Sequence, residues 1–274
     1  MPELPEVEVT VRGLRAKVLG RTFVDVWTDF KKMIKKPGFE KFKKELRGKE
    51  IKGARRRGKN IIMDLSDNYS LLIHQKMTGH LLYGEWSREE GEWRPKGNKI
   101  MEERNNGYIH LMFFFDNGKM LALSDLRKFA KVELWDTKEL EKSEVFTKLG
   151  PDPLKISFKG FKEAIRNRKG KIKKVLMNQE VFAGIGNIYS DEALARAKIH
   201  PFKEISDLTE KDLENLYQAI IKVLKKGIEM GGESISDYRN IEGEKGDFDE
   251  FRKVYRRKKC TFCGGRIERE KIGS

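Results

Sequence analysis

The chain has little cysteine and histidine and no long apolar run. Its 274 residues include two Cys and four His, whereas a closed structural zinc site takes four such ligands. No stretch approaches the roughly 18 apolar residues of a membrane-spanning helix, and residues 1–20 lack the basic start and the apolar core of a signal peptide. We therefore expect a soluble, cytoplasmic protein without membrane contact.

Basic residues outnumber acidic ones. The sequence holds 58 Lys and Arg against 43 Asp and Glu, a formal net charge of +15 at pH 7, and its pI is about 9.6. Such a charge favours a polyanionic partner, above all nucleic acid. The length permits one large or two medium domains, and a hydrophobic content of 38% is enough to build cores.

The basic charge is concentrated in two segments. Residues 31–59 contain fourteen Lys or Arg against three Glu, and residues 252–259 contain six basic side chains in eight positions. Two such segments far apart in the sequence predict one groove lined from both sides. The alternative for 31–44 is a solvated helix or loop that turns Phe39 and Phe42 inward. The three arginines at 55–57 lead into an apolar, strand-like run, so we expect a sheet edge to hold them.

Two halves of the chain follow different periodicities. Helical spacing of valine and leucine predicts an N-terminal helix over 6–19. Short β-branched or aromatic runs bounded by turn residues then predict an antiparallel β-sandwich; these runs are 22–28, 50–56, 60–65, 70–74, 108–115, 119–124 and 131–135. Beyond residue 157 the spacing is helical again, over 158–167, 172–177, 188–197 and 209–230. The fold class is therefore α+β, with a linker near 150–153.

The first residues could carry chemistry. Met1 before the small Pro2 is a good substrate for methionine aminopeptidase, and its removal would leave a secondary amine. An α-amino group has a pKa of about 7.7–8.0, against about 10.4 for lysine, so this nitrogen could attack an aldehyde carbon and form an iminium. Glu3 beside it is suited to general acid or base work. The alternative is that a proline after the initiator methionine has no function.

A glycine pair could bind phosphate. Gly184 and Gly186 precede Asn187 at the start of a predicted helix, where backbone amides are free to meet phosphate oxygens. The side-chain amide of Asn187 can join them. The alternative is an ordinary tight turn between helices.

Six ordered motifs resemble the bacterial formamidopyrimidine-DNA glycosylase family, over nearly the whole chain. They are PELPEVE at 2–8, RGK at 57–59, HQKMTG at 74–79, DLRKF at 125–129, GIGNIY at 184–189 and GGES at 231–234. The resemblance implies a bifunctional glycosylase and abasic-site lyase of base excision repair, which acts as a monomer on damaged double-stranded DNA at the bacterial nucleoid. Its lesions would be 8-oxoguanine and formamidopyrimidines.

The resemblance also implies the domain organisation. A catalytic β-sandwich with an N-terminal helix would span 1–135, and a linker would span 136–156. A helix–two-turn–helix DNA-binding domain with a lesion-recognition loop would follow over 157–245, and a zinc-finger hairpin, incomplete in this chain, over 246–274.

Roles at the reacting sugar follow from the same resemblance. Pro2 would attack C1′ of the damaged nucleotide and displace the base, and Glu3 would protonate the sugar ring oxygen. Glu6 would help to shape the pocket. Lys59 and Asn187 would hold phosphates that flank the lesion.

Further residues would act on the duplex. Met77, Arg127 and Phe129 resemble the residues that fill the space left by an extruded base, although without the resemblance Met77 and Phe129 read as core residues. Tyr238 lies in a segment, 231–251, that would be a mobile loop over the extruded base, with a plain surface loop as the alternative. Glu192 resembles a support of the 184–187 turn.

The sequence departs from the family at its C-terminal end. Cys260 and Cys263 form half of a zinc ribbon, so Zn²⁺ is implied but only two of its four ligands are present. We expect that a tail has been lost; a degenerate finger, or two idle reduced thiols, are the alternatives. The family's Gly-Arg segment is missing too, which puts DNA affinity and full activity in doubt. The four histidines, His74, His80, His110 and His200, are interpreted as structural.

Two other functions stay open. The endonuclease VIII-like group shares the Pro2-Glu3 chemistry but prefers oxidised pyrimidines; Leu4 after Glu3 and the complete set of Met77, Arg127 and Phe129 favour the purine-lesion group. The second alternative is a catalytically silent DNA-binding protein, against which intact Pro2, Glu3 and Lys59 argue.

Overall fold

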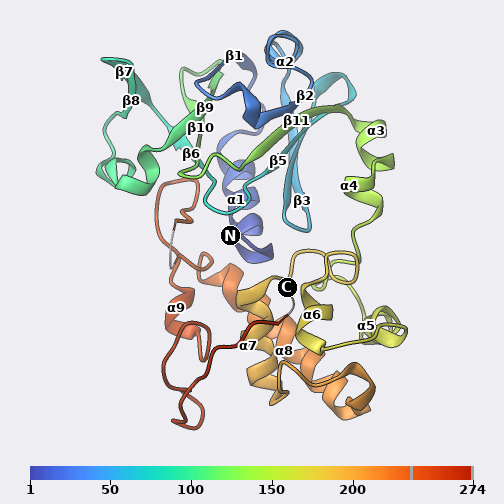
Figure 1. The fold of residues 1–274 in the computed structure, drawn as a ribbon. Helices are drawn as coiled ribbons and strands as arrows, with labels where there is room; N and C mark the ends of the chain where they lie inside the picture. Colours follow the sequence, from blue (N-terminus) through green and yellow to red (C-terminus); the bar gives the residue numbers. More distant parts are fainter. Residues whose placement is uncertain (235–236, 273–274) are drawn as a thin grey trace.

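Helix α1 (Leu4–Lys17) connects the two parts of the molecule. The computed structural model describes residues 1–234 and 237–272. α1 begins at Leu4 because Pro5 is tolerated in a first helical turn, where its missing N–H has no partner to lose. Leu4 packs in the core of the lower, helical part, whereas Val7, Val11 and Leu14 pack in the core of the upper, β-rich part (Figure 1). The start of α1 is thus held between the two parts.

The upper part is the predicted sandwich. One sheet has the order β1 (Phe23–Thr28), β9 (Ile109–Phe115), β10 (Met120–Ser124), β6 (His80–Gly84). The other has the order β2 (Ile34–Lys36), β11 (Lys131–Asp136), β5 (Tyr69–His74), β4 (Asn60–Leu65), β3 (Ile51–Arg57). The pairs are antiparallel except β2 with β11, which is parallel. The prediction of antiparallel sheets is therefore wrong at this edge, where the short β2 reaches β11 directly.

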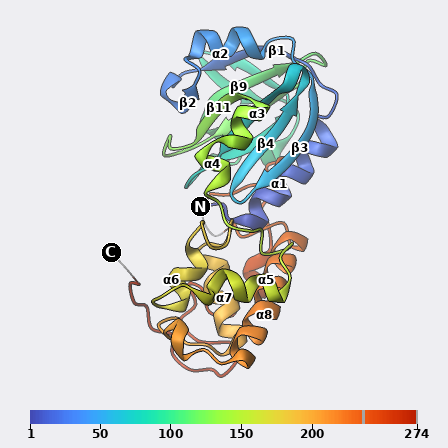
Figure 2. The ribbon, with the colours of Figure 1, turned by 90° about the vertical axis from the view of Figure 1, so that its right-hand side faces the viewer.

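Smaller elements cover the sandwich. α2 (Phe39–Leu46) lies at its far end from the N-terminus, and α3 (Thr137–Lys142) and α4 (Glu144–Thr147) descend toward the helical part (Figure 2). A hairpin of β7 (Trp86–Glu89) and β8 (Glu92–Pro95) projects from β6. Short 3₁₀ turns complete this part; they are Lys31–Met33, Ser66–Asn68, Lys99–Glu102 and Arg104–Gly107.

The lower part is helical, as predicted. It contains α5 (Phe158–Arg166), α6 (Ile172–Met177), α7 (Asn187–Ala197), the 3₁₀ turn Ile205–Asp207, α8 (Glu210–Glu229) and α9 (Phe248–Phe251). α7 and α8 pack against each other around a core that includes Tyr189, Leu216 and Phe248. Within the described ranges, no helix is long and apolar enough to cross a membrane.

The two basic segments form many contacts within the protein. Phe42 is buried and Phe39 packs on the core, while several lysines of 31–44 form exposed ion pairs at the far end of the sandwich (Figure 1). Arg56 pairs with Glu8 and Asp152, and Arg257 donates to backbone carbonyls of its own segment. Several basic side chains of both segments thus have partners within the protein, and one groove lined by the two segments stays a prediction.

Arg57 holds the connection between the two parts. Its guanidinium donates to the carbonyl of Gly150 at 2.6 Å and to that of Leu149, so the chain leaving the sandwich is held to the end of β3. The beginning of the predicted linker is also packed, because Leu140 of α3 is buried against Ile62 and Leu72.

The predicted zinc-finger hairpin is not formed as two strands. In the described part of 252–274, only an isolated bridge pairs Lys259 with Arg266, and the turn at Cys260 is closed by a bond from the Gly264 amide. Two cysteine ligands alone do not complete a zinc site, and a small zinc finger depends on its complete site for folding.

Candidate active site

Glu3 lies at the N-terminus of α7. Its side chain is 2% exposed, and its two carboxylate oxygens accept hydrogen bonds from the amides of Ile188, at 2.9 Å, and Tyr189, at 3.4 Å. A Cβ at Gly186 would come within 2.4 Å of the Glu3 carboxyl carbon, so this position requires glycine. The second glycine of the predicted phosphate turn thus makes room for a carboxylate of the protein itself.

Burial sets the protonation of Glu3. Desolvation raises its pKa, Glu6 raises it further, and Lys59 and the two α7 amides oppose the rise. A carboxyl group with a raised pKa remains protonated in part at a higher pH, which is what a general acid needs.

Lys59 approaches from the sandwich. It follows Gly58 in the turn between β3 and β4, where φ of Gly58 is +59° and its Cα faces Ala183 of the turn before α7. Lys59 is 7% exposed. Burial lowers the pKa of its ammonium group, while Glu3 and Glu6 raise it. The structure therefore brings Lys59 and Glu3, which are distant in the sequence, into one charged cluster.

Pro2 is buried directly before α1, whereas Met1 is 43% exposed. The Leu4 amide bonds the Gly184 carbonyl at 3.0 Å, which holds the chain start against the turn before α7. Asn187, the first residue of α7, is exposed beside it. The Glu3 carboxyl thus lies at the N-terminus of α7, which starts at Asn187, an environment that favours anions, and Pro2 is the residue before Glu3 in the chain.

Glu6 links three segments. Its side chain is 1% exposed. One carboxylate oxygen accepts from the Glu3 amide at 2.7 Å, and the other accepts from the Tyr189 hydroxyl at 2.6 Å and the Glu233 amide at 2.7 Å. Sequence reasoning missed Tyr189, because an aromatic residue inside a helix reads as core; its neighbour Asn187 in the GIGNIY motif was the only signal.

Met77 and Phe129 are exposed, by 41% and 49%. The prediction that composition alone would give, two core residues, is therefore wrong. The guanidinium of Arg127 lies 4.5 Å from the ring centroid of Phe129. Lys76 and Lys128, each beside one of these residues, have φ of +57° and +56°, so both short loops turn sharply and leave their tips in water.

Asp125 joins the two loops from below. Its carboxylate is fully buried and accepts from the Thr78 hydroxyl and from the Ala130 amide, the latter at 2.7 Å. The Arg127 amide contacts both Thr78 and Asp125. A buried aspartate with several donors fixes the loops relative to each other, and its signal in the sequence was its place at the start of the DLRKF motif.

Tyr238 is 5% exposed, and its hydroxyl donates to the carbonyl of Glu6 at 3.0 Å. Burial raises the pKa of its phenol. Contact with an extruded base stays a prediction, and the structure gives this side chain a second use, since it fixes its segment to α1. Ile235 and Ser236 of the predicted loop lie outside the described residues.

Glu192 supports a different segment from the predicted one. Its buried carboxylate accepts from the amides of Lys253, Val254 and Tyr255 and pairs with Arg196. It therefore holds the chain before the cysteine pair to α7, rather than the 184–187 turn.

The histidines have structural partners. His80 is 1% exposed and bonds Asn106, and burial lowers its pKa to about 4. Burial and three lysines lower the pKa of His74 to about 3, His110 contacts Asp29 and His200 accepts from the Phe202 amide. Among the described residues, no group of three or more His, Cys, Asp or Glu side chains could hold a metal ion.

Cys260 and Cys263 are three residues apart in one turn. The backbone amides of Phe262 and Cys263 lower the pKa of the Cys260 thiol, which favours the thiolate that binds metals. Two thiolates do not fit a structural zinc ion, which takes four ligands, so the described residues do not make a complete site.

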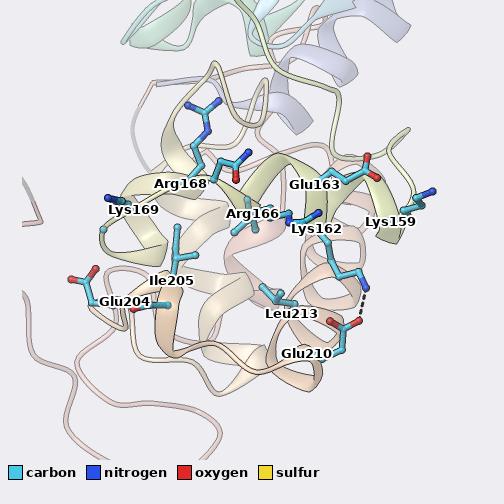
Figure 3. A pocket seen from close by; sticks show the side chains of 14 residues that line it. Lys159, Lys162, Glu163, Arg166, Arg168, Lys169, Glu204, Ile205, Glu210 and Leu213 are labelled. Carbon is cyan, nitrogen blue, oxygen red and sulfur yellow. Dashed lines mark hydrogen bonds and ion pairs between the residues drawn. The ribbon is translucent and has the colours of Figure 1, made fainter.

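A hollow of about 1030 Å³ lies elsewhere, between α5, the turn 167–170 and the start of α8 (Figure 3). It is lined by Ile165, Ile205 and Leu213 among charged side chains, with Lys162 paired to Glu210. None of the side chains described above lines it, so the cluster around Glu3 remains the candidate site.

Comparison with known proteins agrees with this geometry. Residues 1–132 match the formamidopyrimidine-DNA glycosylase N-terminal domain, and residues 149–239 match the formamidopyrimidine-DNA glycosylase H2TH domain. The formamidopyrimidine-DNA glycosylase of Pelotomaculum thermopropionicum is 36% identical over 277 residues, which cover 100% of this chain and 95% of that protein.

Solved structures are similar over the whole chain. A complex of Lactococcus lactis Fpg with DNA that contains an abasic site has a TM-score of 0.85 at 34% identity, over 98% of this chain and 94% of that one. MutM in complex with DNA that contains carbocyclic 8-oxo-G has a TM-score of 0.85 at 34% identity, over 99% and 95%. Two matched domains and a full-length relative show that the chain belongs to the formamidopyrimidine-DNA glycosylase family.

Proposed function

We propose that this protein is a DNA glycosylase and abasic-site lyase of base excision repair, which excises 8-oxoguanine and formamidopyrimidines from double-stranded DNA. The observation that carries the proposal is the buried cluster of Pro2, Glu3 and Lys59 at the N-terminus of α7. The substrate class is that of its relatives, whose structures hold abasic or 8-oxo-G DNA. We further propose that it acts as a monomer on DNA in the bacterial cytoplasm.

Pro2 is the proposed nucleophile, once Met1 is removed. The lone pair of its neutral amine forms a bond to C1′, the glycosidic bond breaks, and the base leaves with the bonding electrons. The bonded Pro2 nitrogen then gives up its proton, which neutralises the departing base and restores the nitrogen lone pair. A terminal amine suits this step because its ordinary pKa of about 7.7–8.0 leaves a useful neutral fraction near pH 7. The exposure of Met1 supports its removal by an aminopeptidase.

Glu3 is the proposed general acid. It gives its proton to the ring oxygen O4′, so the C1′–O4′ bond breaks and the nitrogen lone pair forms the iminium. The raised pKa of Glu3 keeps this proton available. The two α7 amides then stabilise the carboxylate that remains.

Strand cleavage follows from the iminium. The positive nitrogen acidifies the C2′ proton; its loss expels the 3′ phosphate by β-elimination, and loss of the C4′ proton expels the 5′ phosphate by δ-elimination. Glu3, now a carboxylate beside the sugar, is suited to accept these protons.

The remaining residues bind and open the duplex. Lys59 and Asn187 hold phosphates on either side of the lesion, and Glu6 shapes the pocket floor. Met77, Arg127 and Phe129 enter the space of the extruded base, which offsets the unstacking cost of a few kcal/mol. Tyr238 closes over the pocket from its segment.

Zinc is implied by the family, and Cys260 and Cys263 would supply two of its ligands. A complete site needs two more, which the described residues do not offer at this position. We derive no catalytic step from the metal.

The test compares lesions in otherwise identical duplexes. We expect strand scission at 8-oxoguanine opposite cytosine, with phosphate left at both new ends, and little scission at thymine glycol. Preference for thymine glycol would instead assign the endonuclease VIII-like function, and binding without scission of either duplex would assign a silent DNA-binding protein.

A further inference from the structure

We propose that Tyr189 is a positioning residue for this reaction, which acts through Glu6 to couple the segment after α8 to the chain start that carries Pro2. In this arrangement, base excision requires the Tyr189 hydroxyl, whereas attack on an already abasic sugar depends on it much less. The inference rests on the proposed function.

The coupling is built from three short hydrogen bonds on one carboxylate. The Tyr189 hydroxyl and the Glu233 amide share one oxygen of Glu6, at 2.6 and 2.7 Å, and the Glu3 amide takes the other oxygen at 2.7 Å. Glu3 is the residue next to Pro2, and Glu233 lies four residues after the end of α8 at Glu229. A change in the position of the Glu6 carboxylate therefore moves both segments.

Two glycines pack closely against Tyr189 and Glu6. A Cβ at Gly227 would come within 2.5 Å of Tyr189 Cε1 and 2.8 Å of its hydroxyl, and a Cβ at Gly232 would come within 3.0 Å of Glu6 Oε1. Gly232 also has φ of +88°, a conformation that other residues rarely adopt. Gly227 and Gly232 lie on α8 and just after it, so α8 holds the phenol and the carboxylate in a fixed space.

Among its described residues, the segment also contacts α1 at other places. The Tyr238 hydroxyl bonds the carbonyl of Glu6, and Ile241 packs further along, where a Cβ at Gly13 would come within 2.2 Å of it. Arg239 pairs with Glu103, and the carbonyl of Ile241 accepts from the Tyr83 amide. These later contacts hold the segment to the sandwich, while the Glu6 carboxylate determines where the segment begins.

The phenol is a dependable donor. Burial raises the pKa of Tyr189, and Glu6 raises it further, so the hydroxyl stays protonated at working pH and Glu6 serves as the acceptor. The ring is held independently by Phe248, at a centroid distance of 4.9 Å. Removal of the hydroxyl therefore breaks the coupling without emptying the core.

The experiment compares the activity of one variant on two substrates, a duplex with 8-oxoguanine and a duplex with a preformed abasic site. Tyr189→Phe should lower the single-turnover rate of 8-oxoguanine excision by about tenfold, since a hydrogen bond to a carboxylate is lost. The dissociation constant for lesion DNA and the borohydride-trapping rate on a preformed abasic site should each change by less than about threefold. Equal losses on both substrates, or none on either, would overturn the proposal.

A double-mutant cycle tests the route through Glu6. If Tyr189 acts through that carboxylate, Tyr189→Phe should cost no further activity once Glu6→Ala has removed the acceptor. Independent, multiplicative losses would show that Tyr189 acts in another way and would refute the proposed coupling.

Tyr217→Phe is the matched control. Tyr217 also lies in the helical part and also donates its hydroxyl proton, to the Ile156 carbonyl at 2.9 Å, and within the described residues this hydroxyl is not bonded to Glu6. The Tyr217→Phe variant should lose similar stability and keep the full excision rate. If both variants lost excision activity equally, the loss in Tyr189→Phe would be explained by general destabilisation. Failure of the unsubstituted protein on both substrates would count against the proposed function itself.

Discussion

The residues proposed for the chemistry and those proposed for opening the duplex differ in exposure. Glu3, Glu6 and Lys59 are at most 7% exposed, whereas Met77 and Phe129 are 41% and 49% exposed. The first group is held by hydrogen bonds and charge between α1, α7 and the β3–β4 turn. The second stands on loops that Asp125 and Thr78 hold from below.

The difference follows from what each group must do. Charged groups act most strongly in a dry, fixed arrangement, where no solvent reorganisation opposes the reaction. Apolar side chains that fill a gap in DNA must be exposed in the free protein. Only surface that becomes buried on binding contributes to the binding free energy, by roughly 25 cal/mol per Å². The free protein therefore holds the proposed catalytic groups in place in advance and leaves the proposed wedges, Met77 and Phe129, in water.

The largest effect is expected from a substitution that removes the proposed acid and leaves the exposed loops unchanged. Glu3→Gln keeps the shape and the stronger α7 contact, from the Ile188 amide, but removes the proton, so base excision should fall by about 10²- to 10⁴-fold, the usual contribution of acid–base catalysis. Binding of lesion DNA, measured by fluorescence anisotropy, should be unchanged. Normal excision by this variant would remove the acid role from Glu3.

The next effect breaks the loops and spares the chemistry. Combined Met77→Ala and Phe129→Ala should lower 8-oxoguanine excision by about 10- to 100-fold, because the unstacking cost of a few kcal/mol is no longer offset. The melting temperature should not fall, since both side chains are exposed. Leu126→Ala is the control, because Leu126 is 48% exposed on the same loop as Phe129. An equal loss of excision in this variant would show that Met77 and Phe129 have no specific role.

A third prediction separates charge from binding at Lys59. Lys59 lowers the pKa of Glu3, so Lys59→Met should raise that pKa and move the alkaline fall of excision to higher pH, measured at saturating DNA. Loss of one phosphate contact should also reduce the salt slope of binding by about 0.9. A fall at lower pH, or an unchanged slope, would contradict the corresponding role.

The last prediction concerns folding rather than activity, through the buried ring of His80. The folded pKa of His80 is about 4 against an ordinary 6.5, so the unfolded chain binds more protons between these values, and stability should fall as pH falls from 6.5 to 4 by about 1.4 kcal/mol per unit. His74, with a pKa of about 3, adds to the same trend. Urea unfolding at several pH values measures the slope.

His80→Gln should flatten that slope, and His200→Gln, on an exposed histidine, controls for the substitution itself. A slope that His80→Gln leaves unchanged would place the proton uptake elsewhere.

Periodicity predicted most of the elements but not how they meet. The strand 60–65 and the helix 172–177 have the predicted bounds. The start of α1 was predicted two residues late, since prolines read as helix breakers although a first turn accepts Pro5. Strand β6 was missed because its short run follows a motif, and the β7–β8 hairpin because it is highly charged.

The site was predicted by resemblance rather than by pattern. No local rule brings Lys59 to Glu3, since their approach depends on the packing of the β3–β4 turn against the turn before α7. Met77 and Phe129 are apolar, and apolar character alone predicts burial. The roles of Tyr189 and Asp125 could not be predicted from the sequence, because a buried hydroxyl or carboxylate shows its role only through its partners in the fold.

The central claim is that Pro2 attacks the damaged nucleotide within a preformed cluster. Borohydride trapping on a duplex with one 8-oxoguanine opposite cytosine, followed by mass spectrometry of the crosslinked peptide, tests it most directly. We predict a single crosslink at the nitrogen of Pro2, on protein that has lost Met1. A crosslink at a lysine instead, or none from protein shown to lack Met1, would contradict the account.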